Sequence, residues 1–327
     1  MKIFTTDNLS LYKVKKYLKN VTELELTFYD ICDNSCICYT GNYESCQNCP
    51  MCDSSRLDGK GKAKKVMPYL SIKNRLKIQF NNVDRAKELL YRHEYIANKD
   101  DCDLDDIFDG NIYKELSEEN LFINKRDVAF IASCDGYQIF KQKTDDCWLF
   151  LMINNNLNPS LRVKKENLLV PFLIPGPNQP KDFNSFLRPF INEMKELESM
   201  WIFINLFIIV VSINKFFLGG VTCYNAHAQC KFILHAHIIA WTGDIPVLTK
   251  IMNVTGHNSY SGCRFCNIQG IYLQKYKHIY FHPGKYSKKT HSNWLTYIDE
   301  IEAATSSKEK ETLIKQYGNK IVIELLL

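Results

Sequence analysis

The cysteines near the N-terminus are the residues of this chain whose spacing most directly predicts chemistry. Cys32-x3-Cys36 is followed, after a short polar loop, by Cys49-Pro-Met-Cys52. Two close cysteine pairs on two turns let four thiolates reach one tetrahedral zinc ion. We predict a structural Zn2+ site made by these residues, against the alternative that they are free buried thiols. The other cysteines of this segment, which compete as ligands, are Cys38 and Cys46.

A second cysteine pair, Cys263-Arg-Phe-Cys266, lies in the last third of the chain, and histidines follow it. A Cys-x-x-Cys pair with downstream histidines can bind zinc. The sequence therefore predicts a second zinc site from Cys263, Cys266 and His278, although unmetallated thiols would show the same spacing. Other histidines near this pair are His257, His282 and His291.

Two aspartates end apolar runs that indicate buried strands. Asp135 directly follows the run at 128–134, and Asp244 follows the run at 232–241 after a threonine and a glycine. Carboxylates on adjacent strands can hold a pair of Mg2+ or Mn2+ ions, which activate water or a 3'-hydroxyl for phosphodiester cleavage and strand transfer. An aspartate beside glycine is equally a common turn former, so this pattern alone does not separate the two roles.

Charged residues gather in two further segments. Residues 56–77 are strongly basic; beside a metal knuckle such a run can contact DNA phosphates, and it can equally be a solvated face. The residues that would bind DNA are Lys60, Lys62, Lys64, Lys65, Arg75 and Lys77. Residues 100–109 hold an acidic cluster, for which we expect a solvated loop rather than a metal site.

The elements that must position these residues follow from the apolar pattern. Residues 128–134 are a continuous apolar run, which predicts a buried central strand. Further strands are predicted at 148–153, 167–174 and 232–241. Apolar residues recur at helical spacing from Phe186 to Leu197, which predicts a helix that starts near Pro189 or just before it. This order fits an RNase H-like α/β domain but does not by itself single out that fold.

Composition bounds the class of protein. With 46% hydrophobic and 24% charged residues and a net charge of +5, the chain has the make-up of an ordinary globular protein. No secretory signal pattern follows Met1, and thirteen cysteines without one indicate reduced thiols and metal sites. The predicted domains are a helical lead at 1–27, a cysteine-rich zinc knuckle at 28–56, a basic then acidic helical region at 57–125, and a mixed-sheet domain with flanking helices at 126–327.

Residues 201–218 are nearly all apolar and approach the length of a membrane span. Asn205, Ser212, Asn214 and Lys215 would place polar groups and a charge within the bilayer, which argues against a span. The alternatives are a buried core segment and an insertion into the domain. We expect the insertion, and a membrane is not an expected partner.

The ordered motifs of this chain resemble those of the CACTA (En/Spm-type) transposase family in its fungal form. The shared motifs, in family order, are YDICDNSCICYTG at 29–41 with CPMC at 49–52, DIFDG at 106–110, SCDGYQIF at 133–140, KKENLLVPFLIPGPNQPKDFNSFL at 164–187, HAHIIAWTGDIPVL at 235–248 and TGHNSYSGCRFCNIQG at 255–270. They cover most of residues 11–327. No single motif is decisive, but the ordered set is highly specific.

The resemblance implies a partial RNase H-like transposase domain at 126–327, with a cysteine-pair insertion from residue 255. In the intact family an acidic triad cleaves and joins DNA at transposon ends with Mg2+ or Mn2+. Asp135 would be the first acidic residue and Asp244 the second. The third, a Glu in a later helix near a Met-His pair, has no counterpart before Leu327, so we expect a catalytically incomplete chain. The resemblance also implies DNA as a partner, self-association and nuclear localisation.

Two departures from the family pattern bear on activity. Tyr224-Asn225-Ala226 stands where the family usually has Tyr-Asp-Ala, so a carboxylate is lost. The apolar run at 201–218 falls where relatives pass directly from the helix into the segment at 220–224. Three functions therefore compete: a transposase-derived chain that cannot complete catalysis, a non-catalytic zinc-bearing DNA-binding module, and a membrane-anchored protein.

Overall fold

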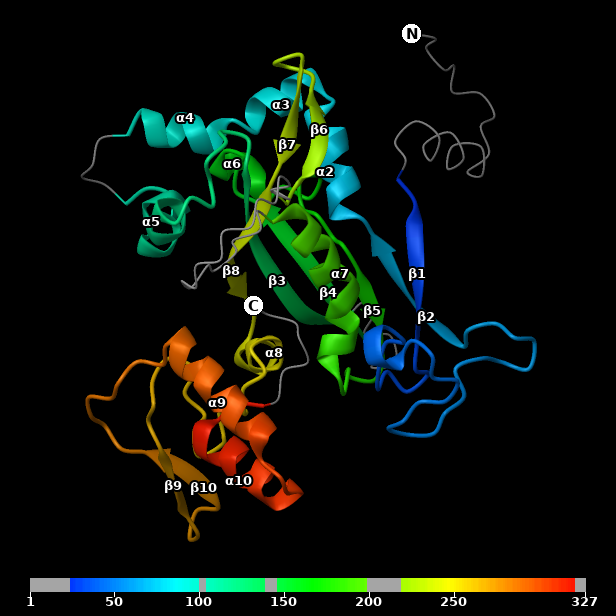
Figure 1. The fold of residues 1–327 in the computed structure, drawn as a ribbon, viewed down its shortest axis with the longest axis vertical. Helices are drawn as coiled ribbons and strands as arrows, with labels where there is room; N and C mark the ends of the chain where they lie inside the picture. Colours follow the sequence, from blue (N-terminus) through cyan, green and yellow to red (C-terminus); the bar gives the residue numbers. More distant parts are fainter. Residues whose placement is uncertain (1–23, 100–103, 139–145, 199–218, 321–327) are drawn as a thin grey trace, which may run out of the picture.

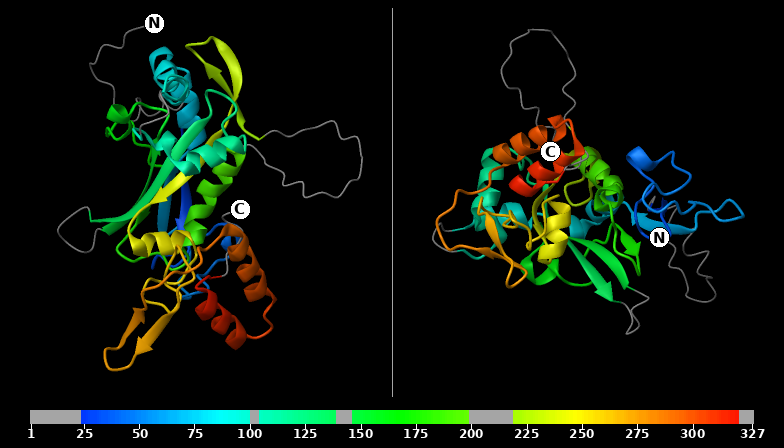
Figure 2. Two further views of the ribbon diagram at one scale, coloured as in Figure 1. Left: turned by 90° about the vertical axis from the view of Figure 1, so that its left-hand side faces the viewer. Right: turned by 90° about the horizontal axis from the view of Figure 1, so that it is seen from below.

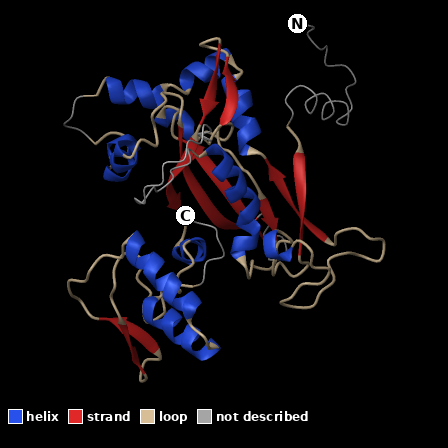
Figure 3. Ribbon diagram, viewed as in Figure 1, coloured by secondary structure: helices blue, strands red, loops and turns tan. Residues whose placement is uncertain are grey.

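The computed structural model describes residues 24–99, 104–138, 146–198 and 219–320, and its architecture is mixed α/β (Figures 1 and 3). A four-stranded mixed sheet forms the centre, and the cysteine-rich loops lie to one side of it. A smaller unit of helices and a hairpin lies beyond one end of the sheet (Figures 1 and 2). The predicted α/β class with a mixed sheet and flanking helices is confirmed.

The central sheet has the strand order β5-β4-β3-β8. β3 (Val128–Gln138) pairs antiparallel with β4 (Asp146–Asn154) and parallel with β8 (Ala236–Thr242). β4 also pairs antiparallel with β5 (Leu173–Pro175). β3 is therefore an internal strand with both edges paired, as its continuous apolar run predicts.

The two faces of β3 enter two different hydrophobic clusters. Phe130 belongs to the larger core, where α7 (Phe183–Leu197) packs on the sheet and the ring centroids of Phe150 and Phe190 lie 4.7 Å apart. Ala129 faces the opposite side and enters a smaller cluster. The aromatic residues buried in that cluster are Phe108, Tyr113 and Phe122. Side chains on both faces therefore hold the strand that carries Asp135.

The start predicted for the helix α7 near Pro189 is wrong. The helix begins at Phe183, after the N-cap Asp182, and Pro189 lies in its interior. A proline inside a helix has no N–H to donate to the carbonyl four residues earlier. Here that carbonyl, on Ser185, accepts a hydrogen bond of 2.6 Å from the hydroxyl of Thr40. The N-terminal segment thus supplies the donor that the helix lacks.

The apolar run predicted as one strand at 232–241 divides into two strands in different sheets. The first of them is β7 (Cys230–Leu234), which forms a hairpin with β6 (Val221–Asn225), and the second is β8. His235 lies between them, with Nδ1 3.3 Å from Asp127 Oδ1 and Nε2 3.0 Å from the carbonyl oxygen of Gly219. These polar contacts hold His235 outside both strands.

The strand predicted at 167–174 is shorter than expected, because only β5 at its end joins the sheet ladder. Pro171 has no N–H to donate to a neighbouring strand. Leu169, two residues before it, makes a single bridge with Met152, and Phe172, directly after it, makes one with Tyr69.

The N-terminal part combines a two-stranded sheet with short helices. β1 (Leu26–Ile31) pairs antiparallel with β2 (Lys65–Leu70), so the cysteine-rich segment is a long excursion between two paired strands. Most of the helical lead predicted at 1–27 lies outside the described residues. The helices of this part are η1 (Gly41–Tyr43), α2 (Ile72–Phe80), α3 (Val83–Glu88), α4 (Tyr91–Ala97), η2 (Ile107–Asp109) and α5 (Asn111–Glu118).

The unit beyond the sheet follows directly from β8. Its elements are α8 (Ile245–Ile251), the hairpin of β9 (Gly270–Leu273) and β10 (His278–Phe281), α9 (His291–Ala303) and α10 (Ser307–Tyr317). The rings of Tyr297 and Tyr317 stack at 4.2 Å and join the last two helices. A further short helix, α6 (Pro159–Arg162), lies within the central domain.

Two carboxylates of the acidic segment are buried, which corrects the expectation of a solvated loop. The side chain of Asp106 is 1% exposed and pairs with the Arg162 guanidinium at 2.8 Å. Asp109 pairs with Lys99 Nζ at 2.5 Å and accepts a hydrogen bond of 2.7 Å from the Tyr95 hydroxyl. These acidic residues therefore connect helices to one another rather than facing solvent.

The apolar run at 201–218 lies outside the described residues, so its assignment as an insertion stays a prediction. Among the helices that the structure does describe, none combines the length and apolar character needed to cross a membrane.

Candidate functional site

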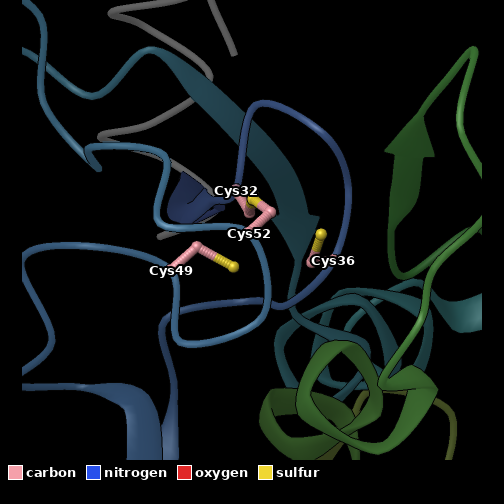
Figure 4. A group of neighbouring side chains, drawn as sticks. All are labelled: Cys32, Cys36, Cys49 and Cys52. Carbon is pink, nitrogen blue, oxygen red and sulfur yellow. The ribbon is translucent and has the colours of Figure 1, made fainter.

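Four cysteine side chains from two facing loops gather around one point (Figure 4). Their Sγ atoms all lie within 4.8 Å of one another; Cys32, Cys36 and Cys49 are buried, and Cys52 is half-buried. A tetrahedral zinc ion with bonds of about 2.3 Å places its sulfurs about 3.8 Å apart. The Sγ atoms of Cys32 and Cys52 are 3.5 Å apart, so the arrangement fits a metal such as zinc.

Two tight turns place these sulfurs. In the first turn Ser35 has a φ of 55° and its N–H donates to the carbonyl of Cys32 at 2.7 Å. In the second turn Asp53 has a φ of 56° and its N–H donates to the carbonyl of Cys49 at 2.8 Å. Each turn folds the chain back on itself, so both cysteine pairs reach the shared centre (Figure 4).

The fold also decides between the competing cysteines. Cys38 is buried in the large core instead, and its Sγ lies 3.6 Å from the carbonyl oxygen of Asp30. Cys46 packs against the cysteine cluster without joining the group of four. The predicted ligand set is therefore the one that the structure brings together.

The surroundings of these thiols shift their pKa values in different directions. The side-chain amide of Asn34 donates to Cys52 Sγ at 3.5 Å and lowers the pKa of Cys52 to about 6. Burial raises the pKa of Cys49 to about 12 and also raises the pKa of Cys36. Buried thiols ionise when a metal ion supplies positive charge. The role of Asn34 was not predicted from the sequence. Its position as a polar residue between two candidate ligands, Cys32 and Cys36, could have indicated it.

β3, which contains Asp135, and β8, which ends two residues before Asp244, are neighbouring strands of the central sheet. β3 and β8 run parallel, and their register pairs Ser133 with Thr242. Asp135 and Asp244 each come two residues after this pair, so both lie toward the same end of the sheet, Asp135 within β3 and Asp244 beyond the end of β8. Both side chains are exposed. The predicted neighbouring strands are confirmed, whereas a shared metal between the two carboxylates stays a prediction.

Contrary to the prediction from the sequence, neither aspartate is the last residue of a strand. Asp135 lies inside β3, which continues to Gln138. Asp244 is the N-cap of α8, where its Oδ1 accepts the N–H of Val247 at 2.8 Å. The turn-forming role that the sequence left open therefore applies to Asp244. A carboxylate has two oxygens, so the cap still leaves one for a metal.

No third metal ligand joins the aspartates within the described ranges. Over those residues, the cysteine group is the only set of three or more metal-binding side chains that converges. A positive charge lies nearby instead: Lys250 of α8 donates to the Gln179 side chain at 3.1 Å and lies 4.4 Å over the ring of Trp148. Burial lowers the pKa of Lys250.

The second cysteine pair does not gather the histidine predicted with it. The Sγ atoms of Cys263 and Cys266 are 3.4 Å apart. His278 instead begins β10, where its ring packs edge-on against Tyr280 with centroids 5.6 Å apart. In the described part of the chain these residues form no three-ligand group, so the predicted second zinc site is not assembled.

The basic segment contains both exposed and internally bonded side chains. Lys60, Lys62 and Lys64 are exposed, and Lys77 is half-buried. Lys65 Nζ donates to Ser35 Oγ at 2.8 Å and to the Gly176 carbonyl at 2.7 Å, and Arg75 donates to the Val170 carbonyl at 2.9 Å. Burial lowers the pKa of both Lys65 and Arg75. These two cations therefore bind the protein's own backbone.

Comparison with known families finds that part of this chain matches a transposase family. Residues 101–205 match the family described as "Transposase family tnp2". The matched region includes β3 with Asp135, β4, β5 and α7, whereas the cysteine knuckle and Asp244 lie outside it. A search of curated proteins finds no match. The family match supports a transposase-related function.

Proposed function

We propose that this protein derives from a CACTA-type (En/Spm-type) transposase and binds DNA at transposon ends in the nucleus. The observation that carries the proposal is the tnp2 family match at residues 101–205, because that region includes the strand with Asp135. The motif order, with SCDG at 133–136 and GDIP at 243–246, supports the CACTA type within that family.

An RNase H-like fold for the central sheet is part of this proposal. Three consecutive antiparallel strands are followed by a helix, and a later strand lies parallel to the first of the three. That connection places two strands of distant sequence, β3 and β8, side by side, with β8 at the edge of the sheet. It is the connection that an RNase H-like site needs, because its carboxylates come from those two strands.

In the proposed site Asp135 and Asp244 supply carboxylate oxygens at one end of the sheet. Mg2+ or Mn2+ ions, when bound there, would polarise the phosphodiester and stabilise its leaving oxygen. Fixing two such ions takes more carboxylates than two, and no third ligand joins the pair over the described residues. We therefore propose that this chain binds DNA but is catalytically incomplete.

The cysteine knuckle has a structural role in this proposal. Its four ligands are all thiols, which is typical of closed structural zinc sites without an open coordination position. Bound Zn2+ would fix the two loops between β1 and β2. The exposed lysines that follow, Lys60, Lys62 and Lys64, would then present their charges to DNA phosphates.

The test of the proposal uses the full 327-residue chain and duplex DNA from the ends of the element that encodes it. We expect tighter binding to these ends than to scrambled duplex of equal length, and no nicking or joining with Mg2+ or Mn2+. Equal, salt-insensitive binding to both duplexes would contradict the transposase origin. Metal-dependent cleavage that Asp135→Ala abolishes would contradict catalytic incompleteness alone.

A non-catalytic zinc-bearing DNA-binding module is the second candidate function. The observation that favours it is the contrast between the complete cysteine group and the two aspartates, which no third ligand joins over the described residues. The two functions differ in the role of Asp135, because a non-catalytic module has no use for an exposed carboxylate there. If Asp135→Asn leaves Mn2+ binding by the chain unchanged, the second candidate is favoured.

A further inference from the structure

The segment between Asp244 and Asp299 has a charge pattern that the proposed function does not use. It contains neither aspartate nor glutamate. Its basic residues are Lys250, Arg264, Lys275, Lys277, Lys285, Lys288 and Lys289. A stretch of this length with positive charges alone favours a polyanionic partner.

The hairpin of β9 and β10 lies within this basic segment and carries two of its exposed lysines, Lys275 and Lys277. Its two strands pair only with each other, in the register that places Ile271 opposite Tyr280 and Leu273 opposite His278. Side chains opposite one another share a face of the hairpin. All of these side chains are exposed, with Ile271 at 62% and Tyr280 at 46%. One hairpin face is therefore a row of uncovered apolar and aromatic groups.

Aromatic rings cluster on this face. The ring centroids of Tyr276 and Tyr280 lie 6.0 Å apart, and those of His278 and Tyr280 lie 5.6 Å apart. Tyr276 is 58% exposed, and Lys275 Nζ lies 5.2 Å over its ring. Lysines alternate with the rings along the chain, at Lys275 and Lys277. Contiguous exposed aromatic and apolar side chains of this kind mark an interaction surface, whereas single scattered ones do not.

We propose that the β9–β10 hairpin binds single-stranded DNA. Tyr276, Tyr280 and His278 would stack on bases, while Lys275, Lys277 and Lys285 would contact phosphates. Aromatic side chains among lysines bind single strands because every base has a flat face, which a duplex keeps stacked inside. The choice of DNA as the nucleic acid rests on the proposed function, whereas the single-strand preference rests on the hairpin itself.

The location of the hairpin agrees with this role. The hairpin belongs to the unit that lies beyond the end of the sheet at which β8 passes into α8 (Figure 1). Asp244 caps α8 at that junction. A single strand held by the hairpin would therefore lie on the same side of the molecule as the two aspartates.

The test measures binding of a fluorescein-labelled single-stranded oligonucleotide to the full chain by fluorescence anisotropy. We expect Tyr276→Ala/Tyr280→Ala to weaken binding at least about tenfold, since stacking contributes substantially for each base. Tyr224→Ala is the matched control, because Tyr224 is 44% exposed on the separate β6–β7 hairpin. It should bind like the wild type.

Charge is tested in the same assay with a second matched pair. Lys275→Gln/Lys285→Gln should weaken binding and reduce its dependence on salt. Lys308→Gln/Lys310→Gln removes equal charge from α10, where glutamates alternate with the lysines, and should have little effect. Photocrosslinking to an oligonucleotide with bromodeoxyuridine should label Tyr276 or Tyr280, a readout that does not depend on the stability of a variant.

The outcomes separate this inference from the proposed function. Wild-type affinity in both hairpin variants, with crosslinks elsewhere, would overturn the hairpin proposal while leaving duplex binding to transposon ends intact. Loss of self-association rather than of DNA binding would identify the hairpin as a contact between protein copies and would equally overturn it. Failure of the wild-type chain to bind any DNA would overturn both proposals.

Discussion

Individual cysteines show how a residue's role depends on its contacts as well as its spacing. Six cysteines lie between Cys32 and Cys52, and only four of them converge. Cys38 shares the same short segment but is buried in the large core. Pairing accounts for the difference, because Cys38 forms a bridge with Ile31, which is buried in that same core, whereas Ile37 and Tyr39 on either side of Cys38 enter the knuckle cluster.

Substitution of one proposed zinc ligand should remove the metal. We expect the purified chain to carry zinc, and Cys49→Ser to lose it together with much of the stability of residues 28–56, because binding energy in such sites is also folding energy. Zinc content and thermal unfolding measure both effects. Cys46→Ser is the control, since Cys46 lies outside the group of four. Equal zinc loss in both variants would contradict the ligand assignment.

The buried His237 gives the fold a pH dependence. Burial lowers the pKa of His237 to about 4, and the side chain is 4% exposed. A histidine in the unfolded chain has a pKa of about 6.5, so between about pH 6.5 and pH 4 the unfolded chain binds a proton at His237 and the folded chain does not. Stability should fall as the pH drops from about 6.5 to about 4, by up to about 3 kcal/mol for this residue.

Urea unfolding at pH 7 and pH 5 measures this effect, and His237→Leu should flatten the difference. His235 works in the opposite direction, because its hydrogen bond with Asp127 raises its pKa. Its contribution is present at low pH and is lost as the pH rises through that raised pKa. An unchanged pH dependence in His237→Leu would mean that the buried carboxylates dominate instead.

At the scale of elements, α7 shows how a helix tolerates an interior proline. Its apolar stripe covers the sheet, and Pro189 itself is buried within that stripe. The carbonyl that Pro189 leaves without a donor is satisfied by Thr40, from a segment distant in sequence. The hydrogen bond thus joins the helix to the N-terminal part of the protein.

Removal of the Thr40 hydroxyl should therefore leave a buried carbonyl without a partner. We expect Thr40→Val to lower the free energy of unfolding by about 1–3 kcal/mol. Pro189→Ala restores an N–H that can bond to the carbonyl of Ser185, so it should recover stability in the Thr40→Val background. Urea titration of the two single variants and the double variant gives the coupling. Additive effects would contradict the compensation.

At the scale of the molecule, the tertiary structure divides the basic side chains of residues 56–77 into two groups with different roles. Lys65 and Arg75 hydrogen-bond to the protein's own backbone, whereas Lys60, Lys62 and Lys64 face solvent. All five side chains carry a positive charge, but half-buried Lys65 and Arg75 have already exchanged water for carbonyl oxygens. Only the exposed lysines are available to replace counterions on DNA.

DNA binding should reflect this division. Each of Lys60→Gln, Lys62→Gln and Lys64→Gln is expected to weaken duplex binding and to reduce the slope of log K against log salt by about 1. Lys65→Gln should mainly lower the thermal stability of the protein. Titrations at several salt concentrations, with unfolding curves for each variant, measure both. The same reduction in slope for Lys65→Gln would contradict the assignment.

The sequence by itself determined the features that depend on neighbouring residues. The cysteine pairs predicted their cluster because each pair sits on one tight turn, and turns are set by local backbone geometry. The apolar run at 128–134 predicted an internal strand, because an uninterrupted run suits a strand covered on both faces. The motif order predicted the transposase family that residues 101–205 match.

Only the tertiary structure decided the features that depend on distant partners. The burial of Asp106 follows from Arg162, and the start of α7 at Phe183 is possible because Thr40 supplies a donor for Ser185. The separation of His278 from the second cysteine pair has the same origin, since pairing with β9 fixes its position. In each case the local sequence was compatible with several contact partners. The partner in the folded protein is a side chain or strand from a distant part of the chain.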